Sequence, residues 1–480
     1  MNPARVLTID LGTSATKAAL WHGTRVVAMT RSPVPTANPC PGWAEQDPAD
    51  WWGSTVDACA QLRVSAPDEY ALVDAVCFSA TRESFALFDA TLQPLRAGVL
   101  WSDQRAGDVA PRLGDAQEFR ARTGVVLNGA SCAAKMLWVA TYEPEPFGTA
   151  RWVLAPRDWI VARLTGEVVT EPTLESRTGC SLLTGGRTGP VADIAGERLP
   201  PVVPTTTVLP VPAGSDADAL GLRPGTAVIP GAGDRACEVL GTGATPRVAM
   251  VSWGTTANVS LPHPGPIADL PSVGAVSRGA LGAFVVEAGL SASGAAVAWL
   301  AALAGLHHDD VLARAAGESP PGARGVVALP WFNGARAPFW RADARAALLN
   351  LTAAHGLADI ARAVVEAVAL DVARCLELLA PSTARLALAG GGAGDPLWRA
   401  SLGAATGRPT VRRRHDDAAS AGARLVAAAA LGERLDLEEL NPIVDEQAAD
   451  RELGKVLAGV RARSDRAAAA VLDLDLDADN

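Results

Sequence analysis

The 480-residue sequence lacks the marks of several large protein classes. Its seven cysteines are scattered singly, without the spacing of a disulfide framework or a metal site. Acidic residues outnumber basic ones, giving a formal net charge of −10, so no extended surface for nucleic acid or anionic membranes is expected. The chain also lacks a signal-type N-terminus and any apolar run of about 18 residues or more, the length needed to span a membrane. We expect a cytoplasmic protein with neither nucleic-acid nor membrane partners.

The composition that remains is that of a globular protein. Hydrophobic residues make up 49% of the chain and charged residues 20%. A chain of this length exceeds one ordinary hydrophobic core, so two domains are expected.

Strand-like and helical patterns alternate along the chain, which predicts an α/β fold. Short β-branched runs predict strands at residues 6–9, 16–20, 26–29, 73–78 and 85–88. Asp47 followed by Pro48 indicates a helix start. Helical spacing of apolar residues predicts a further helix over residues 357–379, and another is expected from the Asp416-Asp417 cap to Gly432.

The beginning of the chain is echoed near its middle. A strand followed by Asp10-Leu-Gly-Thr-Ser14 is matched by a strand followed by Ser252-Trp-Gly-Thr-Thr256, after strand-like runs at 227–230 and 248–252. Such a repeat predicts two related lobes, an N-terminal lobe of residues 1–245 and a C-terminal lobe of residues 246–480.

These two turns carry residue types that suit phosphoryl transfer. Glycine turns expose backbone N–H groups, and hydroxyls and a cation can contact phosphate oxygens. Asp10 can hold water around Mg²⁺. The pattern is not a P-loop, and one such turn alone is equally well a simple hairpin. Two opposed hairpins would suit ATP held between lobes, with phosphate contacts from Gly12, Thr13, Ser14, Lys17, Gly254, Thr255 and Thr256.

Two further glycine-rich turns follow predicted strands. Gly390-Gly-Gly-Ala393 would let the backbone approach a base or ribose closely, although a tight strand-to-helix turn is the simpler interpretation. Pro230-Gly-Ala-Gly-Asp234 places a carboxylate where flanking glycines leave space for a substrate hydroxyl. Asp234 is therefore the candidate base. The alternative is that it belongs to a generic Gly-Asp turn without a catalytic role.

With these elements in this order, the chain resembles the FGGY family of carbohydrate kinases, within the actin, hexokinase and heat-shock ATPase superfamily. The resemblance covers nearly the whole chain. It extends to Gly42-Trp-Ala-Glu-Gln-Asp-Pro48, Leu100-Trp-Ser-Asp-Gln-Arg105, Ala134-Lys-Met-Leu-Trp138, Arg157-Asp-Trp159 with Arg163-Leu-Thr-Gly-Glu167, and Pro338-Phe-Trp340.

The resemblance implies two ribonuclease-H-like lobes around a nucleotide cleft and ATP-dependent phosphorylation of a small sugar or polyol. It makes Asp234 the catalytic base and Asp10 the metal-side acid. It assigns adenosine contacts to Gly391, Gly392 and Ala393, and it is compatible with a homodimer.

The acceptor remains open at this point. Ala80-Thr-Arg-Glu-Ser-Phe85 is similar to a glycerol-kinase form, whereas Trp-Ser-Asp-Gln-Arg105 is closer to a xylulokinase form. Arg82 and Glu83 are candidates for binding adjacent hydroxyls, with Trp101 against the carbon chain and Asp103 nearby. The alternative is that Arg82 and Glu83 form a surface ion pair.

Arg235 departs from the family, which commonly has an amide residue after the catalytic aspartate. An arginine here can pair with Asp234 or with Glu238, or bind an acidic substrate group. The acceptor is accordingly a xylulose-like ketose, a pentitol or a glycerol-like polyol, with a sugar acid as the alternative. A non-catalytic or chaperone-like ATP-binding module is the rival from another class.

Overall fold

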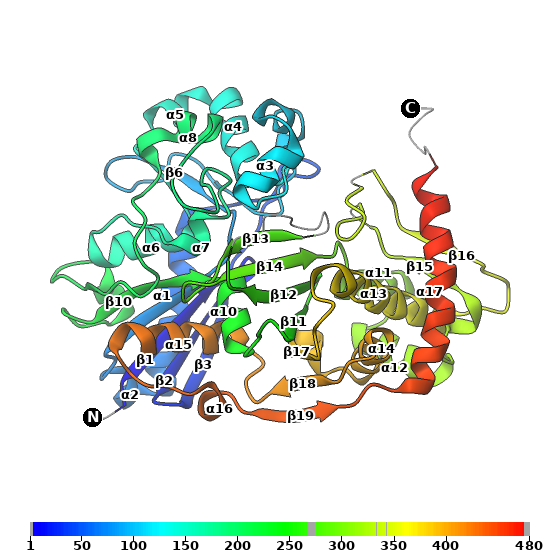
Figure 1. Ribbon diagram of the computed structural model, residues 1–480. Coiled ribbons are helices and arrows are strands. Elements are labelled where there is room, and N and C mark those ends of the chain that lie inside the picture. Colours follow the sequence, from blue (N-terminus) through cyan, green and yellow to red (C-terminus); the bar gives the residue numbers. More distant parts are fainter. Residues whose placement is uncertain (1–2, 266–273, 333, 342, 475–480) are drawn as a thin grey trace.

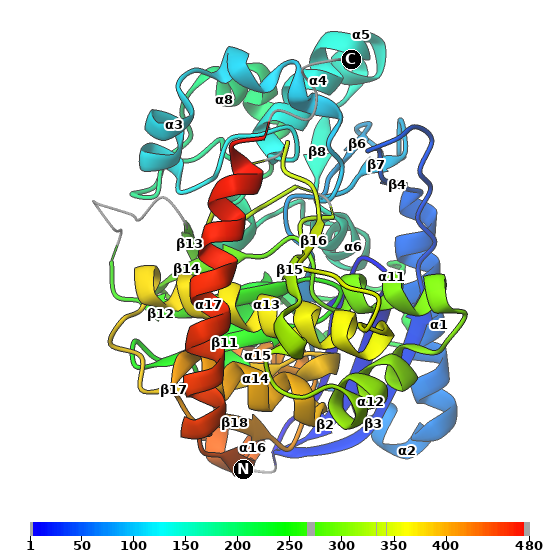
Figure 2. The same ribbon diagram turned by 90° about the vertical axis from the view of Figure 1, so that its right-hand side faces the viewer.

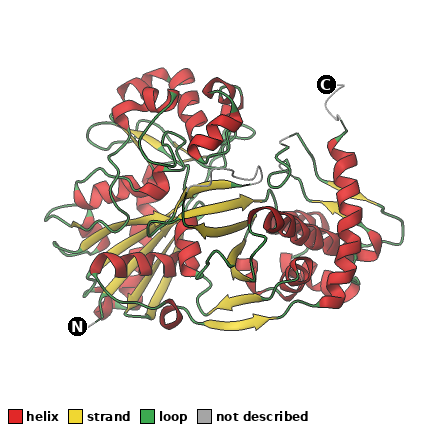
Figure 3. Ribbon diagram, in the orientation of Figure 1, coloured by secondary structure: helices red, strands yellow, loops and turns green. Residues whose placement is uncertain are grey.

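The computed structural model of the protein describes residues 3–265, 274–332, 334–341 and 343–474 (Figure 1). These residues form two α/β lobes, each built on a twisted sheet that helices flank (Figure 3). The predicted fold class, an α/β protein built from two similar lobes, is confirmed.

The sheet of the first lobe has six strands, with a hairpin meander on one side and parallel strands at the centre. β1 pairs antiparallel with β2 and parallel with β5, which in turn pairs parallel with β10. The central strands are buried almost throughout because helices cover both faces. The strand order is β3 (Arg25–Pro33), β2 (Ala15–His22), β1 (Arg5–Leu11), β5 (Ala75–Ala80), β10 (Ala227–Gly233) and β9 (Leu209–Pro210).

The second sheet repeats this plan with one more strand. β14, β12 and β11 form the antiparallel meander, β11, β17 and β18 are parallel, and β19 closes the edge antiparallel. Its order is β13 (Ala275–Arg278), β14 (Phe284–Gly289), β12 (Ala257–His263), β11 (Val248–Trp253), β17 (Arg385–Ala389), β18 (Thr410–Arg413) and β19 (Ile443–Gln447).

The predicted helices form where their caps and periodicity indicated. Asp47 caps α1 (Pro48–Ser65) by accepting a hydrogen bond from the Ala49 N–H. α13 (Leu357–Leu379) has the predicted bounds and is buried along most of its length. The other helices on the second sheet are α11 (Gly294–Ala304), α12 (His308–Glu318), α14 (Pro396–Thr406) and α17 (Arg451–Leu472), and Figure 2 shows α17 running along the outside of this lobe.

A helical region between β5 and β10 stands above the first sheet in Figure 1. Part of this region has a hydrophobic core of its own, and the rest of it packs into the core of the first sheet. Apart from the strand over residues 85–88, its elements were not predicted. Its helices are α3 (Ala116–Thr123), α4 (Cys132–Tyr142), α5 (Pro144–Thr149), α6 (Pro156–Thr165), α7 (Pro172–Glu175) and α8 (Pro190–Ala195), with short strands β6 (Ala86–Phe88), β7 (Gly98–Val99) and β8 (Trp152–Leu154).

Two helices connect the lobes. α10 (Asp234–Gly241) leaves the first sheet, and α15 (Ala418–Leu431), although it lies in the C-terminal half of the chain, packs against β1 and β5. The helices cross so closely that a Cβ at Gly422 would lie 1.9 Å from the Cys237 carbonyl oxygen. The lobes therefore share part of one hydrophobic core. In the described part of the chain, no helix combines the length and apolarity that a membrane crossing requires.

Candidate active site

Asp10 lies at the end of β1, where strand pairing places it beside a hydroxyl and a cation. It is opposite Lys17 on β2 and Ser79 on β5, and the Ser79 hydroxyl donates to Asp10 Oδ1 at 2.8 Å. Lys17 Nζ lies 3.6 Å from Asp10 Oδ2 and 3.2 Å from Asp417 Oδ2. Burial raises the pKa of Asp10 to about 7, although Lys17 acts in the opposite direction.

Asp417 caps α15, so the helix that crosses between the lobes delivers a second acid to this point. The sequence predicted it only as a cap. Among the described residues, no group of three or more His, Cys, Asp or Glu side chains is arranged to hold a metal ion by itself. Two carboxylates beside one lysine suit a metal ion that is already coordinated by phosphate oxygens.

An indole and an amide side chain fix the first glycine turn in position. Gly12 donates its N–H to the Ala15 carbonyl and closes the turn, and Ser14 is exposed. The Trp101 indole N–H donates to Thr13 Oγ1 at 2.8 Å, while the Gln46 amide donates to the Thr13 carbonyl. Trp101 therefore links the predicted acceptor loop to the predicted phosphate hairpin.

The second glycine turn and the glycine-rich loop meet at Trp253. Gly254 and Thr255 are exposed at the end of β11. A Cβ at Gly390, which has φ of 84°, would lie 2.2 Å from the Trp253 carbonyl oxygen, so the loop after β17 needs a glycine here. Gly391 is exposed and Gly392 half-buried, but Ala393 is buried in the hydrophobic core. Only the two glycines are open to a ligand.

Asp234 is the first residue of α10, directly after β10. Its Oδ1 accepts hydrogen bonds from Arg82 Nε at 3.1 Å and from the Arg235 N–H at 2.6 Å. In the part of the chain that the structure describes, no donor contacts its Oδ2, and the side chain is 37% exposed. One carboxylate oxygen is therefore fixed while the other is open to an incoming hydroxyl.

Arg82 connects Asp234 to the second lobe. Both of its terminal nitrogens donate to the Glu287 carboxylate at 2.9 Å, in bidentate geometry, and its side chain is 10% exposed. A Cβ at Gly233 would lie 2.7 Å from Arg82 Cγ and Cδ, so glycine before Asp234 leaves room for this arginine. Arg82 therefore does not belong to a surface ion pair.

Glu287 is the shared carboxylate of this cluster. Arg177 Nη1 lies 3.5 Å and Arg235 Nε 3.8 Å from its oxygens. Burial by itself would raise the pKa of Glu287, but Arg82 and Arg177 outweigh it and hold the pKa well below its ordinary value. Sequence reasoning missed this residue, although a glutamate within the apolar run Phe284-Val-Val-Glu287 is itself a signal of a buried ion pair.

Arg235 pairs with Glu238, one helical turn along α10. Its side chain does not contact Asp234, whose guanidinium partner is Arg82. Of the alternatives open at the sequence level, the structure favours the Glu238 pair.

The remaining predicted acceptor residues have different surroundings. Glu83 Oε1 accepts from Arg177 at 3.0 Å, and Lys135 donates to the Glu83 carbonyl, so the loop after β5 is fixed from two sides. Asp103 is fully buried, and both its oxygens accept hydrogen bonds, from the Ala44 N–H and from Arg105. We infer that Asp103 shapes the Trp101 loop and does not contact substrate.

A polar layer supports the turn that carries Asp234. The Gly233 N–H donates to Thr173 Oγ1 at 2.7 Å, and the Thr173 hydroxyl donates to Glu171 at 2.6 Å. Arg157, fully buried, pairs with Glu171 and donates to the Pro230 carbonyl. The Arg157-Asp-Trp159 segment thus holds the turn in place.

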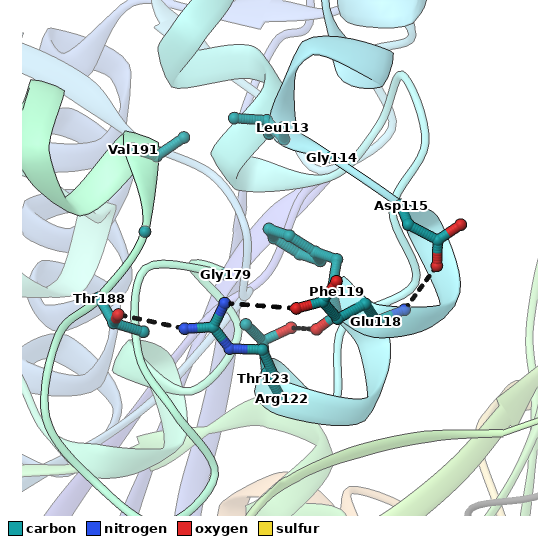
Figure 4. Close-up of a pocket in the computed structure, with 11 residues that line it drawn as sticks. Leu113, Gly114, Asp115, Glu118, Phe119, Arg122, Thr123, Gly179, Thr188 and Val191 are labelled. Carbon is teal, nitrogen blue, oxygen red and sulfur yellow. Dashed lines mark hydrogen bonds and ion pairs between the residues drawn. The ribbon is translucent and has the colours of Figure 1, made fainter.

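A cavity of about 90 Å³ lies in the helical region, away from all of these residues (Figure 4). Phe119 and Val191 line it, and Arg122 on its rim donates to Thr188 at 3.3 Å. Since none of the predicted site residues lines it, it is not the site described above.

The matches to known proteins cover both lobes. Residues 5–241 match the N-terminal domain, and residues 249–431 the C-terminal domain, of the FGGY family of carbohydrate kinases. The chain is 28% identical to the xylulose kinase of Escherichia coli (strain K12), over 90% of this chain and 92% of that protein. It is 30% identical to the glycerol kinase of Gloeobacter violaceus, over 91% and 90%.

The fold has solved counterparts. A ligand-bound xylulose kinase from Lactobacillus acidophilus superposes with a TM-score of 0.90, covering 98% of this chain and 99% of that one, at 22% identity. This likeness concerns the fold alone.

Proposed function

The chain belongs to the FGGY family of carbohydrate kinases and phosphorylates a small sugar or polyol with ATP, and from this premise we propose that Asp234 is the catalytic base. The observation that carries the proposal is the state of its carboxylate, with Oδ1 held by Arg82 and the Arg235 N–H and Oδ2 open. A base must be fixed in orientation and still reach the proton that it accepts.

In the proposed reaction the acceptor hydroxyl attacks the γ-phosphorus of ATP. The new O–P bond forms as the bond from the γ-phosphorus to the β,γ-bridging oxygen breaks, and ADP leaves with the electron pair. The hydroxyl proton passes to Asp234 Oδ2. Arg82 keeps the carboxylate oriented throughout, because its other nitrogens are fixed by Glu287.

We propose that the nucleotide phosphates lie against the two glycine turns. The N-terminal lobe would supply Gly12, Thr13, Ser14 and Lys17, and the C-terminal lobe Gly254, Thr255 and Thr256, with Gly391 and Gly392 near adenosine. The exposure of both turns supports this assignment. Mg²⁺ bound with ATP would offset phosphate charge, and Asp10 and Asp417 are the carboxylates suited to hold it.

The acceptor would lie beside Asp234 and Trp101, with Arg82 and Glu83 forming the wall. A xylulose-like ketose, a pentitol or a glycerol-like polyol fits this proposal, and the relatives named above are kinases for xylulose and for glycerol. A non-catalytic ATP-binding module would have no use for a carboxylate held with one oxygen open.

An acceptor screen tests the proposal. ADP release would be measured with a coupled enzyme over ketopentoses, pentitols, erythritol, glycerol and aldonic acids. We expect ADP release that depends on one of these acceptors. An enzyme that binds ATP but releases ADP equally with and without every acceptor would contradict the proposed function.

A further inference from the structure

One hydrogen bond joins the acceptor side of the site to the phosphate side. The Trp101 indole N–H donates to Thr13 Oγ1 at 2.8 Å, and both residues are half-buried. An indole N–H can only donate, so it occupies an acceptor position of the Thr13 hydroxyl, whose own hydrogen must then point away from Trp101. Within the described residues, the Thr13 hydroxyl donates that hydrogen to no protein acceptor.

The backbone of Thr13 is fixed by a different group. Gln46 Nε2 donates to the Thr13 carbonyl at 2.6 Å, and Gln46 Oε1 accepts from the Trp51 indole N–H at 2.8 Å. With its backbone held, Thr13 keeps only the rotation of its side chain and of its hydroxyl. The hydrogen bond from Trp101 fixes both.

Trp101 is attached to the loop that forms the acceptor wall. Its backbone N–H donates to Ser84 Oγ at 3.0 Å. Lys135, whose side chain is buried, donates to the Leu100 carbonyl at 2.7 Å and to the Glu83 carbonyl at 2.9 Å. One ammonium group therefore holds the two loops together, and the position of the indole depends on the position of the wall.

The phosphate closest to the Thr13 hydroxyl would be the γ-phosphate. In the proposed reaction the acceptor hydroxyl attacks the γ-phosphorus, and the acceptor lies beside Trp101. Because the Thr13 hydroxyl is hydrogen-bonded to Trp101, it lies on the acceptor side of the first glycine turn. The transferred phosphoryl group, which ADP lacks, is the part of ATP that reaches this side.

We propose that Trp101 is a positioning residue for phosphoryl transfer, whose indole N–H directs the Thr13 hydroxyl to donate to the γ-phosphate of ATP. This inference rests on the proposed function and adds a link between the acceptor wall and the phosphate turn. A donor that is already oriented stabilises phosphate charge without reorganising during the reaction. Without the indole N–H, the hydroxyl can rotate and donate to water instead.

Nucleotide binding in the absence of acceptor tests this link. Calorimetry with Mg²⁺ would give the Kd for ADP and for a non-hydrolysable ATP analogue in the wild type, Trp101→Phe, Thr13→Val and the double variant. Phenylalanine keeps an aromatic face without the N–H, and valine keeps the shape of threonine without the hydroxyl. We expect Thr13→Val to weaken analogue binding by about 10-fold and Trp101→Phe by about 3- to 10-fold, with ADP binding unchanged.

The double variant decides whether Trp101 acts through Thr13. It should bind the analogue no more weakly than Thr13→Val alone, because the hydroxyl that the indole directs is already absent. At saturating acceptor, kcat should follow the same pattern. The acceptor KM should rise with Trp101→Phe whether or not Thr13 is changed, because the smaller ring also loses contact with the acceptor.

Trp21→Phe is the matched control. Trp21 also donates its indole N–H to a threonine hydroxyl, that of Thr8 at 3.0 Å, but in a buried core. Thr8 keeps a second partner, because its hydroxyl lies 2.7 Å from that of Ser420. This variant should lower the Tm and leave both nucleotide affinities unchanged.

The outcomes separate the two proposals. An unchanged ratio of analogue to ADP affinity in Trp101→Phe, or losses that multiply in the double variant, would overturn the inference and leave the proposed function standing. Unchanged analogue binding in Thr13→Val would overturn it too, even where Trp101→Phe does not fold. Absence of acceptor-dependent ADP release in the wild type would contradict the proposed function, whatever the binding ratios are.

Discussion

Glu287 should be the residue on which the stability of the site depends most. Its carboxylate, 6% exposed, accepts both terminal nitrogens of Arg82 and lies near Arg177 and Arg235. The variant Glu287→Gln keeps the shape of the side chain but removes the charge, so three arginines lose their common counter-ion.

The expected cost follows from the burial of this pair. Removing one partner of a buried ion pair costs about 3–5 kcal/mol, because the other charge is left uncompensated. Glutamine retains one acceptor oxygen and Asp234 still pairs with Arg82, so we expect a loss at the lower end, about 3 kcal/mol in the free energy of unfolding. The surface control Glu377→Gln, in a pair with Arg461 in which Glu377 is 56% exposed, should cost less than about 1 kcal/mol.

The effect should also depend on pH in a defined direction. Arg82 and Arg177 outweigh burial and hold the pKa of Glu287 below its ordinary value of 4.5. A carboxylate with a depressed pKa contributes stability above its unfolded-state pKa and loses it as the pH falls. The stability difference between wild type and Glu287→Gln should therefore be full at neutral pH and shrink below about pH 4.5.

Urea unfolding followed by tryptophan fluorescence, at neutral pH and at several acid pH values, measures this difference. A variant as stable as the wild type at neutral pH would refute the assignment of Glu287 as the shared counter-ion. A difference that stayed constant down to low pH would show that lost packing, and not lost charge, is responsible.

Three further predictions concern the acceptor wall and the cation. Gly233→Ala should raise the acceptor KM far more than the ATP KM, because the added Cβ displaces the Arg82 side chain. Gly107→Ala, where a Cβ meets nothing within 4 Å, is the control and should leave both KM values unchanged. The same acceptor KM in the two variants would contradict this prediction. Arg82→Ala and Glu83→Ala should each raise the acceptor KM by about 10-fold or more with little change for ATP, and equal effects on both substrates would remove them from the acceptor wall. Chelation of divalent cations with EDTA should abolish turnover and added Mg²⁺ restore it, and turnover that survives chelation would exclude a required cation.

Many of the strands, turns and helices could be predicted because each depends on residues that are close together in the sequence. The hairpin turns, the caps at Asp47 and Asp417, and the 357–379 helix follow from short-range residue preferences, and all of these elements form as predicted. Once β1 and β2 pair, the register alone brings Lys17 opposite Asp10.

The acceptor wall could not be predicted in the same way. Arg82 and Glu287 are 205 positions apart in the chain and meet only because the lobes pack together. Asp417 was recognised as a cap, but its approach to Lys17 depends on the crossing of α15 over the first sheet. Burial of Asp103 with Arg105 likewise depends on tertiary packing.

The variant Asp234→Asn tests the central claim most directly. Asparagine keeps the size of the side chain but cannot take up the hydroxyl proton, so acceptor-dependent ADP release should fall by about 10²- to 10⁴-fold. ATP affinity, measured by calorimetry without acceptor, should stay close to that of the wild type, because the glycine turns are unchanged. Acceptor-dependent turnover near the wild-type rate in this variant would contradict the assignment of Asp234 as the catalytic base.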